Sequence, residues 1–261
     1  MTAILVTGGT GTLGRPLVER LLDAGHDVRI ASRRPAPDGP LPYAWRTVDY
    51  RTGEGLDDAL RGVDAVVHCA ASLGLDVDRT LIAHARRAGV PHLVYISIVG
   101  IERVPLFYYR NKLAAERLLI DSGVPWTILR ATQFHDLVVR VLAALARLPV
   151  LAVPTGTSFQ PVDTGEVAAR LAELAVLPPS GRVTDMGGPQ VRRADDLARA
   201  YLHATGTRRA VFPLHLPGAV ARGYRQGGHL APEHAVGTIG FEEFLARRVT
   251  AQRRDGAAGV R

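Results

Sequence analysis

The sequence predicts an α/β fold, a doubly wound parallel sheet with a small C-terminal cap. In the first half of the 261-residue chain, short apolar runs rich in β-branched residues alternate with amphipathic segments of helical length. A glycine-rich loop joins the first apolar run to the first of these helical segments. From about residue 132 the strict alternation ends, which indicates that the C-terminal part adds a smaller structure to the sheet.

The alternating half contains the expected strands and helices of the sheet. Strands are expected at 3–7, 27–32, 45–49, 64–70, 92–97 and 126–131, and helices at about 13–24, 54–61, 75–88 and 109–122. Strands that alternate with helices imply right-handed crossovers. These strands should therefore pair in parallel, with helices on both faces of the sheet.

The C-terminal half has a looser pattern. Its expected elements are a helix at 136–147, the apolar run "VLAVP", a helix at 164–176, a strand near 183–186 and a helix at 194–204, followed by a stretch from 213 to 240 that proline and glycine interrupt. We expect residues 1–131 to form the core domain and residues 132–248 to complete it and form the cap. Residues 249–261 are expected to be a flexible tail.

Composition and charge narrow the possible partners. The formal net charge is +7, but the arginines occur as scattered doublets without aromatic interleaving, so we expect no nucleic-acid partner. No window approaches 18 uninterrupted apolar residues and the N-terminus lacks a basic signal region, so we expect neither a membrane span nor a signal peptide. The single cysteine, Cys69, fits a reducing cytoplasm. The oligomeric state stays open.

The glycine loop "TGGTGTLG" has the pattern of a dinucleotide site. Gly8, Gly11 and Gly14 permit a tight turn, let backbone N–H groups approach a diphosphate, and let the helix pack closely on the strand. The loop residues expected to contact the cofactor are Gly8, Thr10, Gly11, Thr12, Leu13 and Gly14. A nucleoside-triphosphate loop would need Lys and then Ser or Thr after its last glycine, whereas Arg15 and Pro16 follow here. The core is therefore predicted to be a Rossmann-like dinucleotide-binding domain.

The end of the second expected strand predicts which dinucleotide binds. Sheets that bind NAD place an acidic residue there for the ribose 2′-hydroxyl, whereas this chain has Ser32, Arg33 and Arg34. Two guanidinium groups and a hydroxyl suit the 2′-phosphate of NADP, because arginine binds phosphate through bidentate, charge-assisted hydrogen bonds. We therefore expect NADP(H) as the cofactor. The alternative interpretation of the two arginines is a solvated surface pair.

Two further strand ends should contribute to this site, since ligands bind at the C-terminal ends of parallel strands. Asp49 and Tyr50 close the third expected strand and are expected at the adenine edge. Ala70 and Ala71 close the fourth and are expected along the path of the cofactor. His68 precedes that end within an apolar run, so we interpret it as a buried core histidine.

Six motifs occur in an order that resembles a known superfamily. They are "TGGTGTLG", "SRRP", "VDAVVHCAAS", "LVYIS", "YYRNK" and "WTILRATQF". With them the chain resembles the short-chain dehydrogenase/reductase superfamily, and it looks similar to its atypical, NmrA-like branch of NAD(P)-binding proteins. The resemblance covers roughly residues 1–170.

The resemblance implies a catalytic pair. By that resemblance, Tyr108 is the general acid that protonates a carbonyl oxygen. Lys112, the single lysine of the chain, would hold the nicotinamide ribose hydroxyls and lower the pKa of the tyrosine. A spacing of four residues puts both side chains on one helix face. Tyr109 is the alternative inward-facing tyrosine.

The chain departs from the superfamily pattern after the fifth expected strand. The superfamily places there a hydroxyl that binds the substrate oxygen, whereas Ser97 is followed by Ile98 and Val99. Ser97 thus lies one or two positions too early for that role. We expect it to contact the cofactor instead, with an apolar side chain at the usual catalytic position.

The motif "RATQFHD" follows the sixth expected strand, where the NmrA-like branch turns into its substrate lobe. The candidates to line a substrate pocket are Arg130, Gln133, Phe134 and His135. A helix-capping role is the alternative for His135. The histidines are dispersed and none has the spacing of a metal ligand, so no metal site is expected.

These observations predict an NADPH-dependent reductase, or the reverse dehydrogenase, that acts on a small organic carbonyl, imine or enone. The C-terminal cap would form an apolar cleft for this small-molecule substrate. One alternative is a non-catalytic NADP-binding redox sensor or regulatory protein, which needs the glycine loop but not the tyrosine and lysine. Another is a non-redox isomerase, cyclase or dehydratase, because one fold supports many reactions.

Overall fold

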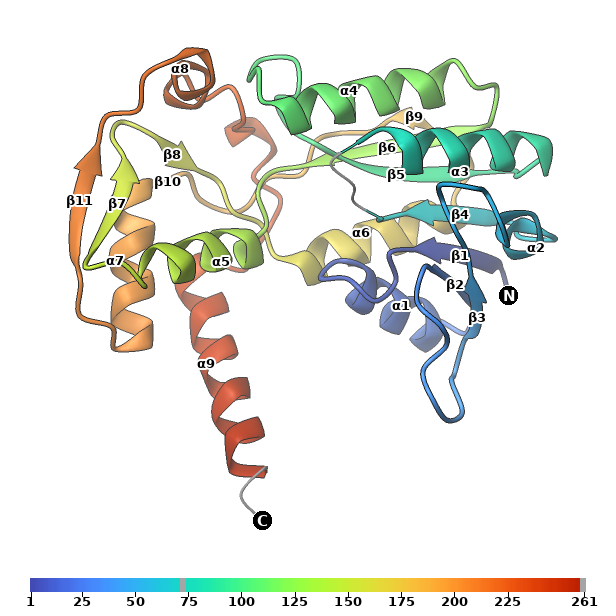
Figure 1. Cartoon of the computed structure of the whole chain (residues 1–261), viewed down its shortest axis with the longest axis horizontal. Helices are drawn as coiled ribbons and strands as arrows, with labels where there is room; N and C mark the ends of the chain where they lie inside the picture. The colour runs from blue at the N-terminus through green and yellow to red at the C-terminus, as the bar shows by residue number, and fades with distance from the viewer. Residues whose placement is uncertain (71–73, 259–261) are drawn as a thin grey trace. The chain divides into compact units, whose positions relative to one another are not determined.

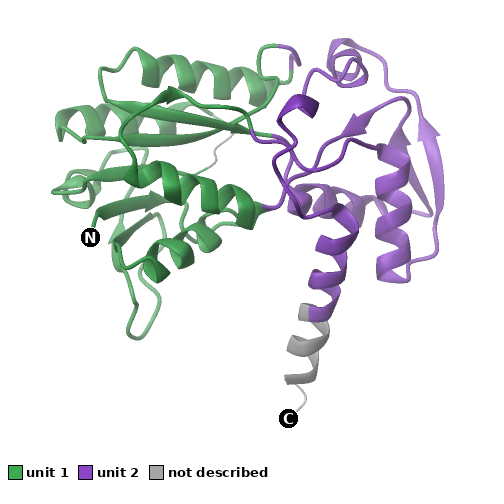
Figure 2. Ribbon diagram, turned by 180° about the vertical axis from the view of Figure 1, so that it is seen from behind, with its two compact units in different colours: residues 1–102, 106–131, 164–185 green, residues 103–105, 132–163, 186–261 purple. Residues whose placement is uncertain are grey.

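The computed structural model describes the backbone of residues 1–70 and 74–258. The chain folds into two compact units (Figure 2). Unit 1 comprises residues 1–102, 106–131 and 164–185, and unit 2 comprises residues 103–105, 132–163 and 186–261. The chain therefore passes into unit 2 after Ala131 and returns to unit 1 at Thr164.

Unit 1 is built on a seven-stranded parallel sheet in the order β3-β2-β1-β4-β5-β6-β9 (Figure 1). Its strands are β1 (Ala3–Thr7), β2 (Asp27–Ser32), β3 (Ala44–Thr47), β4 (Ala65–His68), β5 (Leu93–Ile98), β6 (Trp126–Ala131) and β9 (Gly181–Arg182). The strand order reverses between β1 and β4, and such a switch point is where open α/β sheets bind ligands. The predicted doubly wound α/β fold is confirmed.

Helices cover both faces of this sheet. The helices are α1 (Gly14–Asp23), α2 (Leu56–Leu60), α3 (Asp76–Arg87), α4 (Phe107–Ile120) and α6 (Thr164–Val176). α1 and α6 pack together on one face, whereas α3 and α4 pack together on the other (Figure 1).

The sequence pattern explains how these elements pack. Ile4, Leu5 and Val6 of β1 are fully buried, as a central parallel strand requires because helices cover both of its faces. α1 buries Leu17 and Leu21, which lie four residues apart and so share one helix face. The position of the glycine loop at the end of β1 follows from this packing.

Unit 2 combines helices with two small sheets. Its elements are α5 (His135–Leu145), β7 (Val150–Pro154), β8 (Ser158–Phe159), β10 (Arg192–Arg193), α7 (Ala194–Thr205), β11 (Ala210–Leu214), α8 (Ala219–Arg225), a 3₁₀ turn (Pro232–His234) and α9 (Phe241–Ala258). β7 pairs in parallel with β11, and β8 pairs antiparallel with β10. The core of the unit gathers side chains such as Leu142, Leu151, Leu197 and Phe241.

The structure differs from the sequence expectation in three places. β9 pairs with β6 at only two positions, Gly181 and Arg182, ahead of the strand expected at 183–186. The interrupted stretch from 213 contains the end of β11 and all of α8. Residues 249–258, expected in a flexible tail, continue α9, because their alanine, arginine and glutamine residues have high helix propensity. None of the helices in the described residues is both long and apolar enough to cross a bilayer.

Candidate cofactor site and active site

The loop between β1 and α1 leaves no room for a side chain at Gly8 or Gly14. Gly8 has a φ of +68°, and a Cβ at this position would lie 2.8 Å from the backbone nitrogen of Ala70. A Cβ on Gly14 would overlap the carbonyl oxygen of Gly8. The N–H of Gly11 donates to that same carbonyl at 2.9 Å and closes the turn. At these two glycines the turn therefore presents bare backbone at the carboxyl end of β1.

The N-terminus of α1 provides an anion-binding environment. In the described residues no side chain caps this helix at Leu13, and its first turn contains no acidic residue. The exposed N–H groups and the helix dipole favour a negative charge there. Gly11 and Thr12 are exposed and Thr10 is half-buried, whereas the Leu13 side chain is buried, so only the backbone of Leu13 faces a ligand. The loop therefore fits the diphosphate of a dinucleotide.

Ser32 ends β2, and the exposed Arg33 and Arg34 follow it. The Ser32 Oγ accepts the N–H of Arg34 at 3.1 Å, and Trp45 Nε1 donates to the Arg34 carbonyl at 3.1 Å, so the backbone of this turn is held in place. Neither guanidinium has a carboxylate partner among the described residues. Both are therefore available to a phosphate group.

The expectations for the next strand ends are met unevenly. Asp49 is half-buried, but its Oδ1 accepts the N–H of Arg51 at 2.7 Å and so stabilises its own turn. Tyr50, expected at the adenine edge, is instead a core residue, 5% exposed, and burial raises the pKa of its phenol. Ala70 is half-buried and its N–H donates to Thr7 Oγ1 at 3.2 Å. Ala71 lies outside the described residues.

A row of polar side chains crosses the middle of the sheet. The strand register places Thr7 of β1 beside His68 of β4, and His68 beside Tyr95 of β5. Thr7 Oγ1 lies 2.6 Å from His68 Nδ1. The same Oγ1 accepts the Ala70 N–H at 3.2 Å. All three side chains of the row are fully buried.

Two helix residues, Asp78 of α3 and the buried Lys112 of α4, contact this row. His68 Nε2 lies 3.3 Å from Asp78 Oδ1, and the Tyr95 hydroxyl donates to the same oxygen at 2.7 Å. Lys112 Nζ donates to the Tyr95 hydroxyl at 2.8 Å and lies 4.0 Å from the centroid of its ring. Burial lowers the pKa of Lys112, and the Asp78 charge opposes that shift. The ammonium is thus held by a phenol that a carboxylate orients.

Tyr108 lies in the first turn of α4, four residues before Lys112, and is half-buried, whereas Tyr109 is 4% exposed. The half-buried position favours Tyr108 as the tyrosine that a substrate can reach. Burial raises the pKa of Tyr108, and the charge of Asp78 raises it further. Lys112 makes its hydrogen bond to Tyr95, and its expected lowering of the pKa of Tyr108 stays a prediction.

Ser97 and Arg130 lie side by side in the register of β5 and β6. Ser97 is 3% exposed and its Oγ has no partner among the described residues. Arg130, expected to line the substrate pocket, instead makes two ion pairs: its Nε donates to Glu116 at 2.8 Å and its Nη1 donates to Glu102 at 3.0 Å. All of its guanidinium nitrogens are engaged by these two carboxylates.

The three candidate pocket residues that follow β6 lie in different environments. Gln133 is 9% exposed and lines a cavity in unit 2. Phe134 is half-buried and bridges to Val162 through its backbone. His135, expected in the pocket, is instead fully buried and stacks on Phe244 with ring centroids 4.9 Å apart. The aromatic residues of α9 thus use this histidine as a packing surface.

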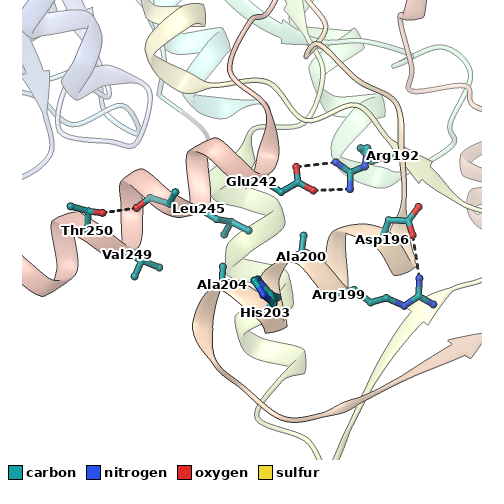
Figure 3. Close-up of a pocket in the computed structure, with 11 residues that line it drawn as sticks. Arg192, Asp196, Arg199, Ala200, His203, Ala204, Glu242, Leu245, Val249 and Thr250 are labelled. Atoms are coloured by element: carbon teal, nitrogen blue, oxygen red, sulfur yellow. Dashed lines mark hydrogen bonds and ion pairs between the residues drawn. The ribbon is translucent and has the colours of Figure 1, made fainter.

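Unit 2 contains two hollows of different character. The groove between α7 and α9 is open, and its charged residues pair with one another, as Arg192 with Glu242 and Arg199 with Asp196 (Figure 3). The other hollow, a cavity of about 540 Å³ lined by α5, β7, α7 and α8, is predominantly apolar. The second has the size and lining of a small-molecule site.

Comparison with known proteins identifies the family. A family model described as NAD(P)H-binding matches residues 8–143, which is more than half of the chain. The chain belongs to this NAD(P)H-binding family. The matched region includes the glycine loop, the end of β2, and helix α4 with its tyrosine and lysine. The predicted dinucleotide cofactor is therefore confirmed as NAD(P)H.

Relatives of this NAD(P)H-binding protein differ in their described roles. It is 35% identical to (4-alkanoyl-5-oxo-2,5-dihydrofuran-3-yl)methyl phosphate reductase of Streptomyces griseus, over 72% of this chain and 68% of the relative. It is 28% identical to a photosystem II assembly factor of Trieres chinensis, over 72% of this chain and 64% of the relative, so this match falls short of two thirds of that protein's length. The NADPH-dependent quinone oxidoreductase of Escherichia coli, solved with NADPH, shares the fold with a TM-score of 0.79 and 21% identity, over 94% and 99% of the two chains.

Sequence reasoning missed the groups that fix Lys112 in this NAD(P)H-binding protein. Asp78 and Tyr95 give no local motif, because one lies in the first turn of α3 and the other within an apolar strand. His68 was recognised as buried, but its neighbours were not. The available signal was the strand register, since Thr7, His68 and Tyr95 occupy one row only when β1, β4 and β5 pair in parallel.

Proposed function

We propose that this protein is an NADPH-dependent oxidoreductase that reduces a small organic carbonyl, imine or enone, or catalyses the reverse oxidation. One observation carries the proposal: Tyr108 and the buried Lys112 lie four residues apart on α4, and Lys112 is held by Tyr95. The description of the Streptomyces relative as a reductase supports it. We also assign the chain to the short-chain dehydrogenase/reductase superfamily and its NmrA-like branch, on the motifs quoted above.

The preference for NADPH over NADH rests on the end of β2. Arg33 and Arg34 are exposed there without carboxylate partners among the described residues, and no acidic residue takes the position of a ribose ligand. Two free guanidinium groups beside the Ser32 hydroxyl suit a 2′-phosphate. The printed description of the Escherichia coli structure as NADPH-dependent supports the same choice.

Each residue of the proposed site has a separate task. The bound nicotinamide supplies hydride chemistry. The Lys112 ammonium has three N–H donors and gives one to Tyr95, so two remain for the ribose hydroxyls. Tyr108 donates a proton to the substrate oxygen or nitrogen as negative charge develops on it, and recovers that proton from solvent.

The C-terminal segments are proposed to hold the substrate. The apolar cavity in unit 2 includes Gln133, one of the expected pocket residues. Gln133 Nε2 donates to the His229 carbonyl at 3.4 Å. The proposed cap is drawn from residues 132–248, of which residues 164–185 belong to unit 1. A cytoplasmic location is also proposed, since the single cysteine provides no intramolecular disulfide.

A second candidate function is non-catalytic NADP binding. The 28% identical relative described as an assembly factor favours it. So does the buried position of Ser97, whose Oγ has no partner among the described residues and offers no ligand for a substrate oxygen. A non-catalytic protein would need the glycine loop and the two arginines, but neither Tyr108 nor its reach to solvent.

A spectrophotometric assay separates these functions. Pure protein is mixed with NADPH and a panel of quinones, aldehydes and imines, and the loss of nicotinamide absorbance is followed for wild type, Tyr108→Phe and the control Tyr109→Phe. We expect turnover by wild type and a fall in kcat of about 100-fold or more for Tyr108→Phe, the scale of general acid catalysis. Turnover that survives Tyr108→Phe would remove the catalytic role. Tight NADPH binding without any turnover would favour the non-catalytic function.

A further inference from the structure

The apolar cavity of unit 2 has a lining that selects for a particular kind of occupant. Its volume is about 540 Å³, within the range of sites that enclose small organic ligands. α5 contributes Leu137, Val138 and Leu142, β7 contributes Val153, and α7 contributes Leu197. An occupant therefore gains most by burying a hydrocarbon chain or ring against these residues, at about fourfold in affinity for each methylene.

The lining contains few polar groups, and only one of them, the guanidinium of Arg225, is charged. They are Gln133, Thr157, Tyr224 and Arg225, and of the described residues that line the cavity none is acidic. The segment from 197 to 232, which supplies the β11–α8 side of the lining, contains no aspartate or glutamate at all. The electrostatic environment of the cavity is therefore positive on the side of α8.

Arg225 is held in place without being neutralised. Its Nη1 donates to the carbonyl of Leu216, another lining residue, at 2.7 Å. No carboxylate pairs with it among the residues that the structure describes. A backbone carbonyl fixes the guanidinium but leaves its charge uncompensated. Its remaining donors match the paired oxygens of a carboxylate or a phosphate.

Gln133 adds a second polar requirement. Its Nε2 donates to the His229 carbonyl, which fixes the orientation of the amide because a carbonyl can only accept. The Gln133 Oε1 then has no partner among the described residues. A buried acceptor without a partner is costly, so a donor group on the occupant would stabilise the cavity.

We infer that this cavity binds an amphipathic organic anion, a molecule with an alkyl, acyl or ring portion buried against α5, β7 and α7 and one carboxylate or phosphate group at Arg225. One part of the inference rests on the proposed function, namely that this anion is the substrate of the reductase. Binding itself requires neither NADPH nor turnover. A neutral hydrocarbon or a cation would leave the guanidinium without a partner.

Calorimetric titration of the full chain without NADPH tests the inference. The probes are decanoate, decyl phosphate, decanol and decylamine, all below their critical micelle concentrations, with octanoate to measure the effect of chain length. We expect both anions to bind at least tenfold more tightly than decanol, decylamine to bind weakest, and decanoate to bind about 15-fold more tightly than octanoate. The ratio of decanoate to decyl phosphate affinity tells which anionic group the site prefers.

Matched variants locate the binding. Arg225→Gln should remove the preference for anions over decanol, whereas Arg222→Gln, on the same helix but outside the lining, should retain it. Leu137→Trp, at a lining position that is 40% exposed and so tolerant of substitution, should weaken all of the probes by filling the cavity. Circular dichroism confirms that each variant is folded.

Three results would overturn the inference: decanol binding as tightly as decanoate, equal losses from Arg222→Gln and Arg225→Gln, or no binding of any probe. These outcomes are independent of the reductase assay. Decanoate binding to a protein that fails to turn over NADPH leaves the cavity assignment in place and removes the proposed function. Turnover of neutral quinones without binding of any anion would support the proposed function and remove the cavity assignment.

Discussion

Lys112 shows how its immediate neighbours decide what a single residue can do. Lys112 is 8% exposed, and its hydrogen bond to the Tyr95 hydroxyl is fixed in direction because that hydroxyl donates to Asp78. Burial acts to raise the pKa of Asp78, but hydrogen bonding and charge from His68 and Lys112 outweigh it and hold that pKa below its usual value. The lysine is thus held by a neutral phenol, and the carboxylate compensates its charge one step away.

Tyr95→Phe tests this arrangement. The substitution keeps the ring but removes the acceptor of Lys112 and one donor of Asp78, and buried groups left without a partner cost about 1–3 kcal/mol. We expect a fall of that size in the free energy of unfolding, measured by urea titration, together with weaker NADPH binding because the ammonium is no longer aimed. The control is Tyr201→Phe, a buried tyrosine of α7 in unit 2. Unchanged NADPH affinity in Tyr95→Phe would contradict the positioning role.

Arg33 carries the residue-scale prediction for cofactor choice. Its guanidinium has no carboxylate partner among the described residues, so a phosphate would not have to displace one. Arg33→Ala should weaken NADPH binding by about 1.5–3 kcal/mol, the scale of a charged hydrogen bond, and leave NADH binding almost unchanged. Fluorescence titration with both nucleotides measures this difference. Arg20→Ala, an exposed arginine at the other end of α1, is the control that should alter neither affinity.

At the scale of elements, Arg130 connects parts of unit 1 that are distant in sequence. It lies on β6, and its two partners are Glu116 on α4 and Glu102 in the connection between β5 and α4. The Glu116 side chain is 4% exposed and that of Glu102 is 47% exposed. The interaction with Glu116 is therefore a buried ion pair, in which the loss of one partner leaves an uncompensated charge.

Arg130→Met should therefore destabilise the fold more than a surface change does. We expect a loss of about 3–5 kcal/mol in the free energy of unfolding because Glu116 is left buried without its cation. Glu102→Gln, at the solvent-exposed side of the same cluster, should cost about 1 kcal/mol or less. Urea unfolding of both variants makes the comparison. Equal effects of the two substitutions would show that burial does not govern this cluster.

The elements of the sheet were largely predictable because their signals are local. The apolar runs of β1, β2 and β6 and the glycine loop can each be recognised within a few residues, and the structure places them as expected. The parallel pair of β7 and β11 was not predicted, because it joins Val150 to Ala210 and no local periodicity encodes a pairing across that distance. β11 and α8 also contain proline and glycine, which mask their regular structure in a sequence pattern.

The candidate site follows the same rule. The spacing of Gly8 and Gly14 predicted the tight turn that the structure has after β1, whereas Tyr108 and Lys112 were named through the resemblance and their roles stay a prediction. The surroundings of Arg130 and His135 were not predictable. A charged or titratable residue after a strand gives the same sequence pattern whether its side chain faces a ligand or a buried partner. Their partners, Glu116 and the aromatic residues of α9, come from other elements, and only the tertiary structure brings them together.

At the scale of the whole molecule, buried histidines link folding to pH. His229 is fully buried, donates from Nε2 to the Ser158 carbonyl at 2.8 Å, and burial lowers its pKa to about 4. Burial also lowers the pKa of His92. In the unfolded chain both imidazoles take up protons near pH 6.5. Below that pH the unfolded state binds more protons than the folded state, so stability falls as the pH falls.

The window for this loss runs from about pH 6.5 down to about pH 4, where native His229 also becomes protonated. The difference in pKa corresponds to about 3 kcal/mol from His229 when the whole window is crossed. Carboxylates such as Asp78 and Glu102, whose pKa values are lowered in the folded state, retain their contribution until the pH approaches about 4. Measurements between pH 7.5 and 4.5 therefore isolate the histidines.

His229→Gln tests the assignment, because glutamine keeps a donor for the Ser158 carbonyl but does not titrate. Wild type should lose stability steadily from pH 7.5 to 4.5, and the variant should be less stable at pH 7.5 but show a clearly shallower slope, with His92 responsible for what remains. Both tryptophans, Trp45 and Trp126, belong to unit 1, so urea unfolding is followed by circular dichroism, which also detects unit 2. Equal slopes for the two proteins would mean that His229 is already protonated, or exposed, in the native state.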